Sequence, residues 1–145
     1  MHLFAGGGGG MYADLILGHT PMVAVEWDKY CCDVLRRRKD EGWWPKCEII
    51  EGDVREFDGT RYAGRVDTIS AGFPCQDISL AGWRAGLDGD RSSLYLEAIR
   101  IIGEARPKYV FLENVAAITI CGVDRVHSDL AKVGFHRQSR GCSRE

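Results

Sequence analysis

The sequence lacks the patterns that mark membrane proteins, metal centres and polybasic nucleic-acid binders. Its apolar runs fall short of the roughly 20 residues that span a bilayer, and it opens without the basic segment and cleavage site of a secretory leader. None of its six cysteines forms a C-x-x-C pair, and no histidine stands at the spacing of a metal ligand, which argues against a zinc site or a disulfide framework. Its net charge of -2 gives no general excess of positive charge for nucleic acid. We therefore expect a cytosolic protein without membrane or metal partners, and 145 residues with 45% hydrophobic content suffice for one domain.

Glycine, in contrast, is abundant, and it is unevenly distributed. The chain has 18 glycines, against a usual frequency of about 7%. Much of the excess lies in residues 6–10 and 72–89. These two segments are the first places in which to look for contact with a ligand.

Short apolar runs alternate with amphipathic segments along the chain. The pattern predicts helices at residues 11–17 and 27–38, at 94–102 with an end at Gly103, and at 124–133 with an end at Gly134. It predicts strands at residues 1–4, 22–25, 47–50, 66–71 and 108–112. Such alternation indicates parallel βαβ units, hence an α/β fold with a doubly wound, mostly parallel sheet that binds ligands at the carboxyl ends of its strands.

Each of the first three predicted strands ends in residues suited to a nucleoside. The run Phe4-Ala-Gly-Gly-Gly-Gly-Gly10 forms a turn that lets a ligand approach the backbone. Glu26 stands 18 positions after Gly8, where a carboxylate holds ribose hydroxyls, and Trp27 beside it is suited to cover an adenine face. Asp53 is suited to accept a hydrogen bond from an adenine amine. A flexible glycine tract, a carboxylate at a helix start and a turn aspartate are the plainer alternatives, and NAD, FAD and S-adenosylmethionine all stay open.

The fourth and fifth predicted strands end in groups that carry chemistry. Cys75 follows Pro74 on a stiff turn before the polar loop 79–90, and its thiolate is a nucleophile once turn amides or a cation lower the pKa. Glu113, at the next strand end, is suited to act as a general acid, although a lone glutamate there also fits a helix cap or an ion pair. The two together suggest attack on an electron-poor ring whose nitrogen the carboxylate protonates. The other five cysteines are interpreted as buried structural residues.

Taken in order, these residues resemble the DNA (cytosine-5)-methyltransferase family, most closely its phage and bacterial members. The runs that match are Phe4-Ala-Gly-Gly-Gly8, Val25-Glu-Trp-Asp28, Gly52-Asp-Val54, Gly72-Phe-Pro-Cys-Gln76, Arg91-Ser-Ser-Leu94 and Glu113-Asn-Val115. The resemblance implies the Rossmann-like fold of S-adenosylmethionine-dependent methyltransferases. It also implies a reaction in which Cys75 adds to C6 of a cytosine flipped out of DNA, Glu113 engages N3, and C5 takes the methyl group.

The resemblance also implies roles for the residues around these two. The residues that it places at the cofactor S-adenosylmethionine are Phe4, Ala5, Gly6, Gly8, Glu26, Trp27, Asp53, Val54 and Pro74. Those that it places at the substrate are Gln76, Ser79, Arg91 and Asn114. By the same resemblance the partner is DNA, in the cytoplasm of a bacterial or phage-infected cell, where DNA methylation accompanies restriction-modification.

The sequence departs from the family's pattern in the loop and, more widely, after residue 134. Asp77-Ile-Ser79 stands where many members have Pro-Phe-Ser. The family's Gln-Arg-Arg type motif, target-recognition region and closing helix have no counterpart, and residues 135–145 are interpreted as a basic, unstructured tail. We therefore expect residues 1–134 to form the cofactor and nucleophile half of a truncated catalytic domain, with the C-terminal strands missing.

Two alternatives to a complete enzyme stay open. The first is a non-catalytic fragment that binds S-adenosylmethionine and needs a second chain to supply the target-recognition half. The second is a nicotinamide-dependent Rossmann oxidoreductase, which would use the glycine turn and Glu26 but would leave Cys75 and Glu113 without a role.

Overall fold

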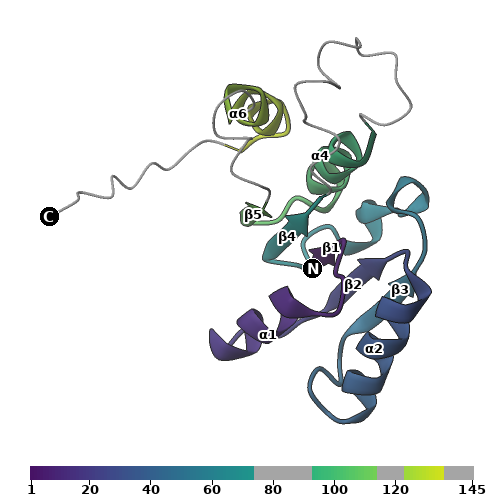
Figure 1. Ribbon diagram of the computed structural model, residues 1–145. Coiled ribbons are helices and arrows are strands. Elements are labelled where there is room, and N and C mark those ends of the chain that lie inside the picture. Colours follow the sequence, from purple (N-terminus) through teal and green to yellow (C-terminus); the bar gives the residue numbers. More distant parts are fainter. Residues whose placement is uncertain (74–92, 114–122, 136–145) are drawn as a thin grey trace, which may run out of the picture.

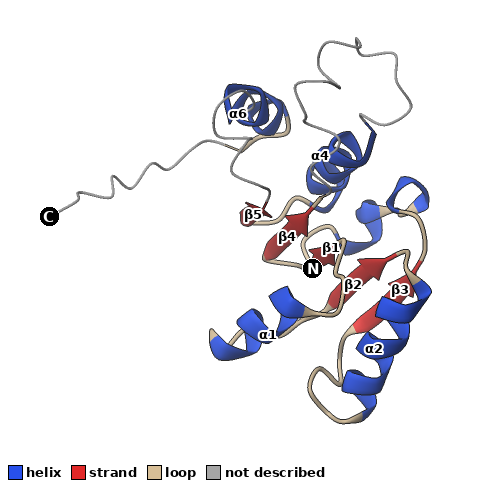
Figure 2. Ribbon diagram, in the orientation of Figure 1, coloured by secondary structure: helices blue, strands red, loops and turns tan. Residues whose placement is uncertain are grey.

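A computed structural model describes residues 1–73, 93–113 and 123–135, which form a parallel sheet with helices on both faces (Figures 1 and 2). The strands are β1 (His2–Leu3), β2 (Val23–Glu26), β3 (Glu48–Glu51), β4 (Thr68–Gly72) and β5 (Tyr109–Glu113). The helices are α1 (Gly9–Ile16), α2 (Lys29–Asp40), α4 (Ser93–Ala105) and α6 (Val123–Lys132), with 3-10 helices η1 (Val54–Glu56) and η2 (Gly59–Tyr62). The strand order β3-β2-β1-β4-β5, with every pair parallel, confirms the predicted doubly wound α/β fold.

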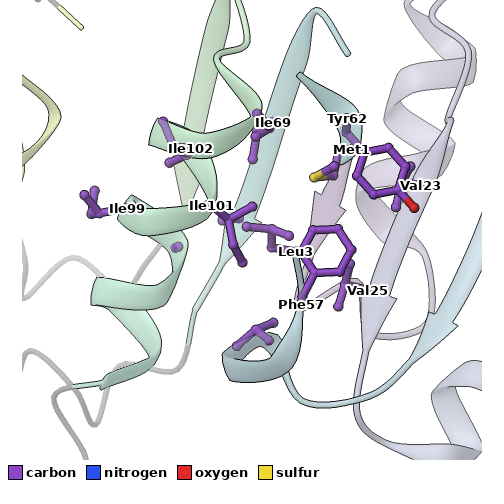
Figure 3. Packing of buried hydrophobic residues seen from close by; sticks show 14 of the residues in the cluster. Met1, Leu3, Val23, Val25, Phe57, Tyr62, Ile69, Ile99, Ile101 and Ile102 are labelled. Carbon is purple, nitrogen blue, oxygen red and sulfur yellow. The ribbon is translucent and has the colours of Figure 1, made fainter. Parts of the chain in front are cut away.

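Side chains that alternate along the strands build one hydrophobic cluster on each face of the sheet. In the larger cluster, Ile101 and Ile102 of α4 meet Leu3 of β1 and Ile69 of β4 (Figure 3). The smaller cluster, on the face that α1 and α2 cover, consists of Met11, Ala24, Leu35, Trp44 and Cys47. Because both faces are covered, every residue of β1 and β2 is buried, and three of the four residues of β2 are apolar.

The helix ends follow from local sequence, with one exception to the prediction. Asp28 caps α2 by accepting from the amide of Cys31, and basic residues occupy its last turn, where cations suit the helix dipole. The predicted end of α4 at Gly103 is wrong, because the helix continues to Ala105. It ends where Arg106 adopts a left-handed conformation (φ 49°), directly before Pro107.

Gly103 serves packing rather than termination. A Cβ at this position would lie 3.1 Å from Cγ1 of Val133, just after α6. The missing side chain therefore lets the end of α6 approach α4 closely. The predicted end of α6 at Gly134 is confirmed, since this glycine follows the helix with a φ of 95°.

The other predicted elements are found within a few residues of their expected positions. The two 3-10 helices between β3 and β4 were not predicted, because a 3-10 helix of three or four residues is too short to show periodicity. Cys32 and Cys47 are buried as expected, Cys31 is partly exposed, and the other three cysteines lie outside the described residues, as does nearly all of the predicted tail. In the described parts of the chain, no helix is long and apolar enough to cross a membrane.

Candidate functional site

The carboxyl ends of the strands bring the predicted site residues to one edge of the sheet. The strand register places Leu3 beside Val25 on one side and Ala71 on the other, and Ala71 beside Leu112. The residues that follow these four positions form a row across the edge: Phe4, Glu26, Gly72 and Glu113. The row crosses the point between β1 and β4 where the strand order reverses, which is where doubly wound sheets bind ligands.

The glycine turn after β1 has an open part and a packed part. Phe4, Gly6 and Gly8 all have positive φ values of 53° to 94°. A Cβ added at Gly6 or Gly7 would meet nothing within 4 Å, so the backbone there is open to a ligand. At Gly8, by contrast, a Cβ would lie 2.9 Å from Cδ2 of Leu35. Gly8 therefore lets the turn pack closely against Leu35 of α2. Gly8 is also the N-cap residue of α1.

Glu26 holds the turn against β2. Its side chain is buried, and Oε1 accepts hydrogen bonds from the amides of Trp27 and Asp28, both at 2.9 Å. Oε2 accepts from the amide of Gly6 at 2.7 Å. A carboxylate offers about four acceptor positions, so one remains on Oε2 beside the glycine turn. This remaining acceptor position is suited to a hydroxyl group, such as that of the predicted ribose.

Trp27 presents a large aromatic surface directly beside this carboxylate. Its side chain is 78% exposed, although tryptophan is highly buried on average. An exposed aromatic ring at a strand end is suited to stack on a planar base. Contact of Trp27 with adenine stays a prediction.

Asp53 follows β3 and caps η1. Its Oδ1 accepts from the amide of Arg55 at 2.9 Å, and this bond, aided by the Arg55 side chain, lowers the pKa of Asp53. The carboxylate is ionised at neutral pH and accepts hydrogen bonds only. Val54, the next residue, is buried in the larger cluster and fixes the start of η1 in the core.

On the other side of the row, Glu113 stands beside Gly72. The two residues are paired in the register of β4 and β5, and a Cβ at residue 72 would lie 3.2 Å from Oε2 of Glu113. A side chain at residue 72 would therefore crowd the Glu113 carboxylate. Phe73 is buried with its ring 5.3 Å from that of Tyr95, which anchors the chain where it leaves β4.

Six predicted site residues cannot be compared with this geometry. Cys75, Pro74, Gln76, Ser79, Arg91 and Asn114 lie outside the described residues. The structure thus brings the residues predicted for the cofactor to the carboxyl ends of β1, β2 and β3, and places Glu113 at the same edge. The last described residue before Cys75 is Phe73, which follows the Gly72–Glu113 pair.

The sequence reasoning missed the polar residues that support these loops. Arg100 donates to the carbonyls of Val54 and Phe57, and His2 of β1 contacts Asp14 of α1. Two features of the sequence could have indicated these roles: Arg100 is a charged residue between Ile99 and the apolar pair 101–102, and His2 is a histidine inside a predicted strand.

Comparison with known proteins identifies the family. The model of C-5 cytosine-specific DNA methylases matches residues 1–137. The type II methyltransferase M.Eco47II of Escherichia coli is 35% identical over 118 residues, which cover 81% of this chain and 27% of that protein. M.PspPI of Psychrobacter sp. (strain TA137) is 35% identical over 92% of the chain and 31% of its own length. M.AquIA of Picosynechococcus sp. is 37% identical over 78% of the chain and 46% of its own length.

The chain thus spans less than half of the length of these curated relatives. Among solved structures, a proposed RNA methyltransferase, PH1948 from Pyrococcus horikoshii, aligns with a TM-score of 0.62 and 24% identity over 93% of this chain and 56% of that one. At this identity the likeness concerns the fold alone, and it agrees with the Rossmann-like sheet described above. With the family match covering nearly all of its residues, the chain belongs to the C-5 cytosine-specific DNA methylase family.

Proposed function

We propose that this chain is the cofactor-binding and nucleophile part of a DNA (cytosine-5)-methyltransferase. The observation that carries the proposal is the row formed by Phe4, Glu26, Gly72 and Glu113 at the switch point of the sheet. This row joins the proposed nucleoside-binding side and a side with an acid group along one edge of the sheet. Family membership is the second support.

The residues on the nucleoside side fit S-adenosylmethionine. The open backbone at Gly6 admits a ligand, Glu26 keeps an acceptor for a ribose hydroxyl, Trp27 stacks on adenine, and the ionised Asp53 accepts from the adenine amine. Phe4, Ala5, Gly8, Val54 and Pro74 complete the proposed pocket. Bound there, S-adenosylmethionine supplies the methyl group. A nicotinamide cofactor would use the same edge of the sheet but would leave Glu113 without a function.

The chemistry that we propose begins with the thiolate of Cys75. The sulfur forms a bond to C6 of a cytosine flipped out of the duplex, while the carboxyl group of Glu113 protonates and holds N3. C5 of the resulting enamine would then take the methyl group of S-adenosylmethionine, which would leave as S-adenosylhomocysteine. Transfer of the C5 proton to a solvent base, cleavage of the C6–sulfur bond with release of the Cys75 thiolate, and return of the N3 proton to the Glu113 carboxylate restore the aromatic ring. Gln76, Ser79, Arg91 and Asn114 are proposed contacts to the substrate.

Recognition of a particular DNA sequence requires more than these 145 residues. The chain matches only 22–46% of the length of its curated relatives, so we propose that a further region or a second chain reads the bases. The same observation supports a second candidate, a fragment that binds S-adenosylmethionine without catalysis. Because the relatives M.Eco47II and M.PspPI are bacterial enzymes, we place either form in the cytoplasm.

Titration calorimetry tests the cofactor proposal. We expect S-adenosylmethionine to bind and NAD not to bind. Trp27→Ala should weaken binding about tenfold, because base stacking on an aromatic ring contributes about 1–3 kcal/mol. Tyr30→Ala is the matched control, because Tyr30 is an equally exposed aromatic residue (77%) in the first turn of α2. This substitution should leave the affinity unchanged. Binding of NAD in place of S-adenosylmethionine would contradict the proposal.

Covalent trapping tests the nucleophile. The chain is mixed with S-adenosylmethionine, with DNA containing 5-fluorocytosine, and with the target-recognition part of a relative. Fluorine at C5 cannot leave as a proton does, so the Cys75 adduct should persist on a denaturing gel. Cys75→Ser should abolish it, and Cys31→Ser, which alters a partly exposed thiol on α2, should not. An equal yield from Cys75→Ser would refute the assignment, while cofactor binding without any adduct would favour the non-catalytic candidate.

A further inference from the structure

The turn that carries Asp53 is held from behind by helix α4. The side chains of Val54 and Phe57 are buried in the larger hydrophobic cluster, and Asp53 remains about one-third exposed. Within η1, the carbonyl groups of Asp53 and Val54 accept from the amides of Glu56 and Phe57. The carbonyl of Val54 has a second acceptor position and that of Phe57 lies after the end of η1, so both can bind donors from another element.

Arg100 of α4 supplies these donors. One terminal nitrogen of its guanidinium, Nη2, donates to the carbonyl of Val54 at 2.9 Å, and the other, Nη1, donates to the carbonyl of Phe57 at 3.1 Å. The planar group thus bridges the first residue of η1 and the residue after its end. Glu97 and Glu104, one turn away on either side in α4, accept from the same guanidinium and fix its orientation.

Glu104 extends this hold to the next turn. Its Oε2 accepts a hydrogen bond from the amide of Gly59 at 2.9 Å, while Oε1 accepts from Arg100 at 2.7 Å. A Cβ at residue 59 would lie 2.9 Å from Oε2 and 3.1 Å from the carbonyl oxygen of Ile101, so only glycine permits this approach. Two α4 side chains, Arg100 and Glu104, thereby bind three backbone groups of residues 54–59. We call these two side chains the α4 clamp.

We propose that Arg100 is a positioning residue for the cofactor: by bridging the carbonyls of Val54 and Phe57, it fixes the turn that presents the Asp53 carboxylate to the adenine amine. The inference rests on the proposed function for the role of Asp53. A lysine at residue 100 would keep the positive charge, but its single ammonium group cannot reproduce the planar fork. Arg100→Lys therefore separates geometry from charge.

The first experiment measures discrimination between two nucleosides. S-adenosylhomocysteine carries the amine that Asp53 would accept from, whereas S-inosylhomocysteine carries an oxygen at that position. We expect the unaltered chain to prefer the adenine compound by at least about tenfold, the effect of one hydrogen bond to a charged acceptor. In Arg100→Lys this ratio should fall toward one. A general loss of stability lowers the two affinities together and does not change their ratio.

Arg38→Lys is the matched control. Arg38 also donates to a carboxylate, that of Glu41, but it belongs to α2 and is not part of the α4 clamp. This variant should keep the ratio of the unaltered chain. Glu104→Gln provides a second test if Arg100→Lys does not fold, since it weakens the clamp without changing side-chain size. We expect it to lower the ratio in the same direction and by a smaller factor.

A second readout needs no ligand. The amide of Arg55 and its side chain lower the pKa of Asp53, so opening of the turn in Arg100→Lys should raise that pKa toward its ordinary value, as followed by NMR titration of the carboxyl group. An unchanged Asp53 pKa together with an unchanged nucleoside ratio would overturn the role of Arg100. A shifted pKa with no adenine preference in the unaltered chain would instead overturn the proposed role of Asp53 in cofactor binding.

Discussion

His2 links the central strand to α1 through a buried contact. Its Nε2 lies 2.7 Å from Oδ2 of Asp14, and a Cβ at Gly10 would lie 2.9 Å from its Nδ1. Burial lowers the pKa of His2, and this effect outweighs the opposing hydrogen bond to Asp14. The imidazole is therefore neutral at neutral pH, and the folded state resists its protonation.

This contact predicts a pH dependence of stability. The pKa of His2 is lower in the folded state than the ordinary value of about 6.5, so the unfolded chain binds the proton first as the pH falls. The free energy of unfolding should then decrease below about pH 6.5, until the folded-state pKa is passed. Urea unfolding between pH 8 and 5 measures the change, and His2→Gln should flatten the curve in this range.

His127 of α6 provides the control for this measurement. His127→Gln should retain the pH dependence, because it alters a histidine on another helix than the one that carries Asp14, the partner of His2. The buried amino group of Met1 has a pKa lowered from 8.0 by burial, so it changes stability in the same direction at higher pH in all three proteins. A curve for His2→Gln as steep as that of the unaltered chain would show that His2 is not the titrating group.

At the scale of elements, the turn between β1 and α1 combines two kinds of glycine. The sequence predicts the whole run as a place of ligand approach, and at Gly6 and Gly7 the structure leaves the backbone open. Gly8 differs, because it has a φ of 94° and lies against Leu35 and Trp44. A glycine is required at residue 8 by the backbone conformation and by the packing against α2.

The difference predicts unequal effects of alanine within one short run. Gly8→Ala should lower the free energy of unfolding by about 1–3 kcal/mol, because the left-handed conformation and the crowding of Leu35 both oppose a Cβ. Gly9→Ala should be neutral or slightly stabilising, because a Cβ there meets nothing within 4 Å at the first position of α1. Urea unfolding followed by circular dichroism compares the two, and equal effects would contradict the packing argument.

For the whole molecule, the two faces of the sheet are covered unequally. Val110 and Leu112 of β5 pack in the larger cluster, so the alternate residues Tyr109 and Phe111 point to the face of α1 and α2. In the described part of the chain these two side chains are 68% and 63% exposed. Parallel sheets are normally buried on both faces, and exposed apolar surface of this kind promotes association.

We therefore expect the 145-residue chain to self-associate as its concentration rises, as measured by sedimentation velocity. Phe111→Lys should reduce the association without lowering stability, because the side chain that it replaces is mostly exposed. Leu96→Lys alters an apolar side chain of α4 that is 39% exposed, and it should leave association unchanged. Identical sedimentation of the two variants would rule out this face as the contact.

The order of the elements and the arrival of the candidate residues at one edge of the sheet could be predicted from local sequence. Apolar runs of four or five residues between amphipathic segments determine a parallel sheet, and the strand ends then place Glu26 and Glu113 at one edge. The end of α4 could not be predicted in this way. Gly103 has the residue type of a helix end, but its role depends on the approach of Val133, which is distant in sequence.

What only the tertiary structure decided is how the site residues are held. Glu26 was predicted as a ligand for ribose, yet three of its acceptor positions bind backbone amides of its own chain. The role of Arg100 depends on carbonyl groups more than 40 positions away in sequence. Residue type and spacing determine which groups reach the edge of the sheet, because those follow from the local period of the chain. Which hydrogen bonds orient those groups depends on contacts between distant elements, and these form only when the chain folds.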